Sequence, residues 1–148
     1  MGEPSIDKLQ TPRVDADAIF LIAAPRDARM LVPQLRYYGA TRLPIYATAM
    51  VYSGRPNRSQ DQDLAGVMFC DAPWLLAEED AAQRHAVVEA GGAAGSNLRL
   101  WAMGMDAYRL SRQLGVLQGG NTSYEGASGN LSLKPGNRIH RQLLCARF

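Results

Sequence analysis

The chain has 148 residues, of which 47% are hydrophobic and 20% are charged. This length fits one domain that buries roughly two thirds of its unfolded surface, and the composition excludes a disordered or fibrous chain. The net charge is only +2 with arginines scattered singly, which disfavours a nucleic-acid-binding protein. No apolar run approaches the ~20 residues of a membrane span, and the first residues lack the basic and apolar segments of a signal peptide.

The N-terminal half predicts a strand, helix and strand. Residues 1–14 have no hydrophobic period and are expected to form a flexible tail before a domain that spans residues 15–148. The continuous apolar run at residues 18–23 predicts a central parallel strand covered on both faces. Helical spacing over residues 26–38 and a second apolar run at 45–47 complete a right-handed βαβ unit.

A long polar loop over residues 48–62 then leads to a third apolar run at residues 66–70. We interpret the carboxylates of Asp61 and Asp63 as solvated loop charges. In open α/β sheets, ligands bind beyond the carboxyl ends of the strands, so a site is expected where this loop leaves the sheet. The residues predicted to line a ligand or partner crevice there are Pro25, Arg26, Thr48, Tyr52, Asp71 and Trp74. The alternative for Trp74 is a place in the core.

The C-terminal half predicts two helices and a hairpin. Acidic residues 78–80 precede the first helix, and apolar residues at helical spacing predict the second over residues 98–114. Residues 115–129 are rich in Gly, Ser and Asn and are predicted to be loop. Alternating residues on either side of a Pro-Gly-Asn turn predict a β-hairpin over residues 130–142, and the chain then ends as a strand.

Few residues suggest chemistry. Cys70 and Cys145 are interpreted as buried thiols rather than a disulfide, although an oxidising compartment would favour a bridge. Cys70, Asp71 and His85 are the residue types of a thiol hydrolase, but their spacing is not diagnostic. Two histidines and two distant cysteines match no zinc-site spacing, and residues 126–130 lack the ending of a phosphate loop. We therefore predict no catalytic residue, no metal and no cofactor.

Six blocks of sequence stand in the same order along this chain as in a known protein family. The fifth block contains the run Val-Met-Phe-Cys-Asp-Ala-Pro-Trp. The blocks lie at residues 17–29, 33–39, 43–48, 51–54, 63–76 and 136–141. Together these blocks resemble the C-terminal domain of the LppC/LpoA family, whose members are outer-membrane lipoproteins that activate a bifunctional penicillin-binding protein from the periplasm. The resemblance covers about residues 15–148.

The resemblance implies part of a fold like that of type I periplasmic binding proteins, in which two α/β lobes surround a crevice. It also implies a non-enzymatic regulator of peptidoglycan synthesis with a penicillin-binding protein as partner. The alternative is a lobe that binds a small, amino-acid-like molecule. Residues 126–133 would be the element that closes the lobe.

The chain also departs from this family. It lacks the lipidated N-terminal cysteine, the helical repeat domain and the first half of the binding-protein-like domain, and Leu143-Leu144-Cys145 replaces the usual Leu-Pro-Trp. We therefore expect a fragment or the product of a shortened gene. A periplasmic location is implied for the full-length family, with a cytoplasmic fragment as the alternative for this chain. Because the helix at residues 98–114 would pack on an absent lobe, we also expect it to self-associate or rearrange.

Overall fold

The computed structural model describes residues 15–92, 95, 97–118 and 123–148, so the predicted tail lies outside the described residues. The strands are β1 (Ile19–Leu21), β2 (Ile45–Ala47), β3 (Met68–Asp71), β4 (Ser123–Glu125), β5 (Asn130–Lys134), β6 (Arg138–Gln142) and β7 (Leu144–Arg147). The α-helices are α1 (Pro25–Tyr37), α2 (Arg58–Asp61), α3 (Pro73–Leu76), α4 (Ala81–Glu89) and α5 (Asn97–Gln118), and short 3-10 turns lie at Ala40–Arg42, Ala49–Val51 and Gln62–Leu64.

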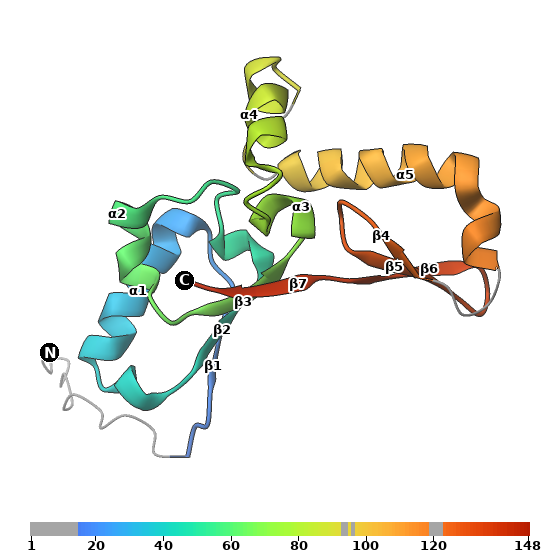
Figure 1. Cartoon of the computed structure of the whole chain (residues 1–148). Coiled ribbons are helices and arrows are strands. Elements are labelled where there is room, and N and C mark those ends of the chain that lie inside the picture. The colour runs from blue at the N-terminus through green and yellow to red at the C-terminus, as the bar shows by residue number, and fades with distance from the viewer. Residues whose placement is uncertain (1–14, 93–94, 96, 119–122) are drawn as a thin grey trace, which may run out of the picture.

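A four-stranded sheet in the order β1-β2-β3-β7 forms the body of the molecule. The first three strands are parallel, with Phe20 opposite Tyr46 and Tyr46 opposite Met68, and β7 runs antiparallel to β3. The predicted βαβ unit is thus confirmed. Figure 1 shows that α1 and α2 lie on one side of this sheet.

Helix α1 follows its local sequence signals. Pro25 occupies its first turn, where the missing N–H costs nothing, and Gly39 adopts the left-handed conformation with φ of 97° just beyond its end. Ala28 and Val32 are fully buried against the sheet, on the face that the helical spacing predicts. The buried residues of the strands that share this core are Leu21, Ile45, Ala47 and Phe69.

The prediction that the first strand is covered on both faces is wrong. β1 lies at the edge of the sheet, and Phe20 is 68% exposed while Leu21 on the opposite face is only 8% exposed. Among the described residues, helices pack against only the face that carries Leu21. The apolar run therefore reflects a strand with one covered and one bare face.

A second sheet, in the order β4-β5-β6, projects beside α5 and away from the body (Figure 1). β5 and β6 form the predicted hairpin, and Gly136 and Asn137 both have positive φ in its turn. The predicted loop at 115–129 is wrong in part, because α5 continues to Gln118 and Ser123–Glu125 form β4. A three-residue strand has no period of its own, and β4 is held by pairing with β5 and by the packing of Tyr124 beside Leu131.

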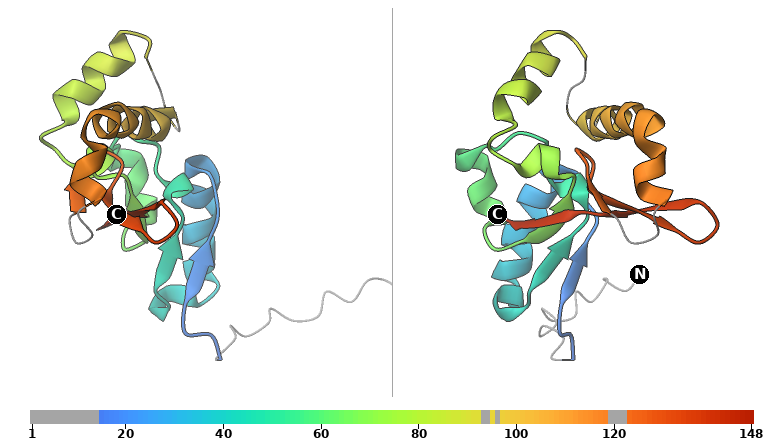
Figure 2. Two further views of the ribbon diagram at one scale, coloured as in Figure 1. Left: turned by 90° about the vertical axis from the view of Figure 1, so that its right-hand side faces the viewer. Right: turned by 45° about the vertical axis from the view of Figure 1, so that its right-hand side comes forward.

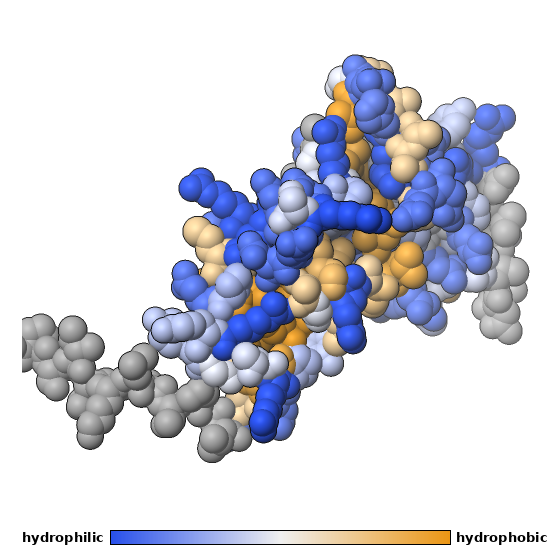
Figure 3. Space-filling model, turned by 60° about the vertical axis from the view of Figure 1, so that its left-hand side comes forward, coloured by the Kyte–Doolittle hydropathy of each residue, from blue (hydrophilic) through white to orange (hydrophobic). Residues whose placement is uncertain are grey.

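Helix α4 stands away from both sheets (Figure 2). The side of the molecule that carries α1 and α2 is largely hydrophilic, with interruptions of apolar surface (Figure 3). On that side the carboxylate of Asp61 pairs with the Arg29 guanidinium at 2.9 Å, with both side chains at most 20% exposed, so its interpretation as a solvated charge is wrong. Within the described ranges, no helix has the length and hydrophobicity needed to cross a membrane.

Candidate functional site

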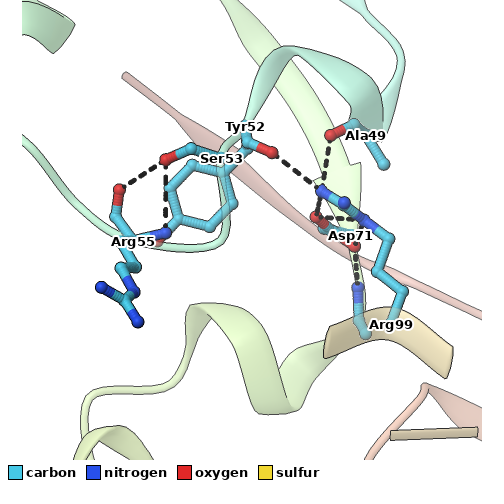
Figure 4. A network of polar contacts seen from close by, with 7 residues as sticks. Ala49, Tyr52, Ser53, Arg55, Asp71 and Arg99 are labelled. Atoms are coloured by element: carbon cyan, nitrogen blue, oxygen red, sulfur yellow. Dashed lines mark hydrogen bonds and ion pairs between the residues drawn. The ribbon is translucent and has the colours of Figure 1, made fainter. Parts of the chain in front are cut away.

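A buried ion pair lies at the carboxyl end of β3. The Asp71 side chain is 2% exposed, and the Arg99 Nε donates to its two carboxylate oxygens at 2.9 and 3.0 Å. The Arg99 Nη2 makes a further contact with the same carboxylate (Figure 4). A charge-assisted bidentate pair of this kind fixes the position of both side chains.

The remaining hydrogen bonds of Arg99 join α5 to the loop after β2. Its Nη2 donates to the main-chain carbonyls of Ala49 at 2.7 Å and Tyr52 at 3.0 Å (Figure 4). The Ala72 N–H donates to the Asp71 carboxylate at 2.8 Å. The protein's own guanidinium thus occupies the place beyond the strand ends where the crevice was predicted, and its Nε and Nη2 donate to groups of the same chain.

The sequence-predicted crevice residues do not all meet there. Asp71 belongs to the network, Tyr52 joins it through its carbonyl, and Thr48 immediately precedes the turn that contains Ala49. Pro25 and Arg26 lie in the first turn of α1 and take no part in the Asp71–Arg99 network.

The aromatic candidates are core residues. Trp74 is 2% exposed, in keeping with its alternative interpretation, and its Nε1 donates to Gln83 at 2.9 Å. Tyr52 is 8% exposed, and its ring lies 5.4 Å from that of Phe69. Burial raises the pKa of the Tyr52 hydroxyl, so this group is neutral at physiological pH. Neither ring offers a free binding edge.

Arg99 was missed because only the apolar residues of the predicted helix were considered. A positive charge in the first turn of a helix is opposed by the helix dipole. An arginine at such a position is therefore favoured when it has an acidic partner, and that conflict is the signal in the sequence. The identity of the partner, 28 residues earlier at Asp71, comes only from the fold.

A second buried carboxylate anchors the turn between β4 and β5 to the same helix. Asp106 on α5 is 2% exposed and accepts hydrogen bonds from the Ala127 N–H at 2.8 Å and the Ser128 N–H at 2.7 Å. Below this contact, Leu110 of α5 packs against Leu131 of β5. Helix α5 is therefore fixed at Arg99 to the parallel sheet and at Asp106 to the antiparallel one.

Gly126 is expected to be essential for this anchor. A Cβ built at Gly126 would lie 2.6 Å from the Asp106 Oδ2, and that carboxylate cannot turn away without losing its two main-chain donors. We expect Gly126→Ala to lower the free energy of unfolding by about 1–3 kcal/mol, measured by urea denaturation. The matched control is Gly104→Ala in α5, which meets no atom within 4 Å and should raise stability by about 0.5–1 kcal/mol. Equal effects of the two substitutions would contradict the proposed clash.

The cysteines form a disulfide, and the prediction of buried thiols is wrong. Cys70 on β3 lies directly opposite Cys145 on β7, which brings together two residues that are 75 positions apart. A sulfur held in a disulfide is not a nucleophile, so the thiol hydrolase alternative fails.

His85 does not lie where the base of a thiol hydrolase would be needed, since its side chain is 72% exposed and pairs with Glu89 at 3.4 Å. In the described part of the chain, no three His, Cys, Asp or Glu side chains gather as a metal site would require.

The three parallel strands, the antiparallel β7 and the hairpin define one lobe of a periplasmic-binding-protein-like domain. The chain is similar to a "putative branched-chain amino acid ABC transporter" from Chromobacterium violaceum, with a TM-score of 0.61 and 29% identity, over 90% of this chain and 42% of that one. It is also similar to the LpoA C-domain from Haemophilus influenzae, described as a regulator of PBP1A, with a TM-score of 0.72 and 23% identity over the same shares.

Residues 3–148 match the family described as "LppC putative lipoprotein", and the chain belongs to this family. It is 30% identical over 136 residues to the penicillin-binding protein activator LpoA of Dickeya chrysanthemi, and 32% identical over 135 residues to that of Pectobacterium parmentieri. The matches cover 90% and 89% of this chain. They cover 20% of each relative, so the chain spans about a fifth of their length.

Proposed function

We propose that this domain is a non-enzymatic regulator of peptidoglycan synthesis that activates a bifunctional penicillin-binding protein by protein–protein contact. The proposal rests on the family match along residues 3–148 and on relatives that are named as penicillin-binding protein activators. We take residues 15–148 to be part of a larger binding-protein-like domain, as the share of the relatives that is matched suggests.

The internal pairing of the polar groups supports regulation rather than catalysis. Asp71 and Asp106, the two buried carboxylates of the described residues, are both occupied by hydrogen bonds within the chain. The pairing of Asp71 disfavours an amino-acid-binding lobe, because its carboxylate is not free for the ammonium group of such a ligand and the Thr48 hydroxyl is the one buried side-chain oxygen of the six crevice residues without a partner. We therefore expect free amino acids at millimolar concentration to leave the melting temperature unchanged.

We place the protein in the periplasm, with an outer-membrane anchor in the full-length members of the family. The Cys70–Cys145 disulfide supports this location, because disulfides persist in oxidising compartments and are rare in the cytosol.

A binding and activity measurement tests the function. The purified chain is immobilised, and the bifunctional penicillin-binding protein of its source organism is passed over it by surface plasmon resonance. We expect saturable binding, together with a faster rate of glycan polymerisation or cross-linking when the chain is added in solution. A fold-matched control is the Chromobacterium violaceum protein, which has a similar lobe but a different description. No binding, or equal activation by the control, would contradict the proposal.

The outer face of α5 is the surface that we propose for self-association. Leu98 and Ala102 are buried, whereas Leu100 is 65% exposed and Tyr108 67% exposed, and Trp101 lies between them along the same helix. An apolar strip of this kind favours contact with another molecule. Light scattering should detect a concentration-dependent dimer that Trp101→Glu weakens, and a monomer at all concentrations would contradict this proposal.

A further inference from the structure

A hollow of about 260 Å³ lies between the loop that follows β2 and helix α4. One wall is a single face of α4, because the helix residues that line it recur at intervals of three and four positions. Residues 54–56 of the loop form the opposite wall, and Leu98 at the start of α5 completes the lining. None of the six predicted crevice residues lines this hollow. The residues of α4 that line it are Ala81, Arg84, His85 and Val88.

The charged side chains around the hollow are all basic. Arg55 comes from the loop, and Arg84 and His85 come from the helix, whereas no acidic residue lines it. The acids nearest to the helix wall are engaged elsewhere, since Asp80 lines a different hollow against α5 and Glu89 pairs with His85 at 3.4 Å. Neither arginine forms an ion pair within the described part of the chain. A concave surface with charge of one sign attracts anions.

Arg84 is held in place by main-chain groups. Its Nη1 donates to the carbonyls of Trp74 and of Ala77, the second at 2.7 Å, and its side chain is half-buried. Its Nε and Nη2 donate to no group of the described residues. The guanidinium is a planar fork of donors that matches the oxygens of a phosphate or carboxylate. The anchored side of this fork fixes its position, and the other side remains available to a ligand.

The backbone that carries Arg55 is also fixed. The Ser53 hydroxyl donates to the Arg55 carbonyl at 2.9 Å. Gly54 has φ of 83°, and a Cβ built there would lie 3.0 Å from the Leu98 Cδ1, so the loop passes close to α5. Figure 4 shows the Arg55 side chain directed away from the Asp71–Arg99 network. This side chain is exposed and makes no hydrogen bond within the described residues, so it is free to contact a ligand in the hollow.

We propose that this hollow binds a phosphate group, carried either by a soluble molecule or by a lipid headgroup. Two guanidinium groups from opposite walls suit a doubly charged oxyanion, with charge-assisted hydrogen bonds to several of its oxygens. Val88 and Leu98 provide apolar lining, which lowers the local dielectric constant and strengthens these bonds. A water molecule occupies about 30 Å³ of liquid, so the hollow has room for a phosphate and part of the group attached to it.

The same chemistry disfavours a free amino acid, because its ammonium group would lie among the cations that attract its carboxylate. The inference depends on this hollow and not on the proposed regulatory function, so either can fail without the other.

Titration with inorganic phosphate, followed by NMR at physiological ionic strength, tests the site. We expect saturable shifts of the main-chain amides of Gly54, Arg55, Arg84 and His85, with a Kd in the millimolar range or below. Arg55→Gln should raise this Kd at least fivefold, and it should leave the fold intact because the side chain is exposed and free of hydrogen bonds within the described residues. Shifts that do not saturate would overturn the proposal.

The matched control is Arg58→Gln. It removes the same charge from an exposed position of α2 that does not line the hollow, and it should change the Kd less than twofold. Salt at physiological concentration limits the reach of a charge to about 8 Å, so the two variants separate a local contact from general attraction. Equal effects of Arg55→Gln and Arg58→Gln would overturn the proposal.

Vesicles distinguish the two sources of the phosphate. The chain is sedimented with vesicles of phosphatidylcholine, alone or mixed four to one with phosphatidylglycerol. Binding to the mixed vesicles that Arg55→Gln weakens at least fivefold, and that Arg58→Gln does not weaken, would assign a lipid headgroup. Saturable binding of inorganic phosphate without vesicle binding would assign a soluble phosphorylated molecule. Binding of neither phosphate nor mixed vesicles would overturn the proposal.

Discussion

Removing the Cys70–Cys145 disulfide is expected to lower the free energy of unfolding by about 4 kcal/mol. The two cysteines are 75 residues apart, and closing a loop of that length in the unfolded chain removes conformational entropy worth about that amount. Chemical denaturation of the Cys70→Ala/Cys145→Ala double variant measures the loss directly.

Reductant provides the internal control for this prediction. A dithiol reagent should destabilise the native chain to the level of the double variant, and it should leave the double variant itself unchanged. A loss below about 1 kcal/mol would mean that β7 is held almost entirely by its pairing with β3, or that the unfolded chain keeps structure that offsets the entropy.

Asp71→Asn is expected to cost about 3 kcal/mol. Asparagine keeps the shape of the side chain but leaves the Arg99 guanidinium without a counter-charge in a site where the carboxylate was 2% exposed. We expect the lower end of the range for broken buried pairs, because the Arg99 side chain is 21% exposed and water reaches part of it.

The matched control is Asp63→Asn, the same chemical change at an exposed position of the 3-10 turn Gln62–Leu64, which should leave stability unchanged. The double variant Asp71→Asn/Arg99→Met should recover part of the loss, since it removes the unpaired charge as well. An Asp71→Asn protein as stable as the control variant would show that the pair does not hold α5 to the sheet.

The parts of the fold that were predicted from sequence are those with local signals. The strand, helix and strand from Ile19 to Ala47 are marked by two apolar runs on either side of a helical hydrophobic period, with Gly39 just beyond the end of the helix. The hairpin was predicted because Gly136 and Asn137 accept the positive φ that its turn requires. These features need no knowledge of distant residues.

The features that were missed are those that depend on distant partners. A three-residue strand such as β4 acquires its conformation from β5, and Arg99 acquires its role from Asp71 on another element. The disulfide depends on the antiparallel return of β7, which brings Cys145 opposite Cys70. Of the six predicted crevice residues, only Asp71 and Tyr52 belong to one hydrogen-bond network, because Arg99 from a distant helix joins the loop after β2 to the end of β3.

The disulfide-linked pair of strands β3 and β7 has a consequence for how this chain can change in length. Everything between the two strands leaves the sheet and returns to a base that is fixed by main-chain pairing and by the disulfide. Doubling the length of a flexible loop costs only about 0.6 kcal/mol. Insertions and deletions around α4, which stands apart from both sheets, should therefore be tolerated in evolution far more readily than a one-residue change within β3 or β7, where the register would shift.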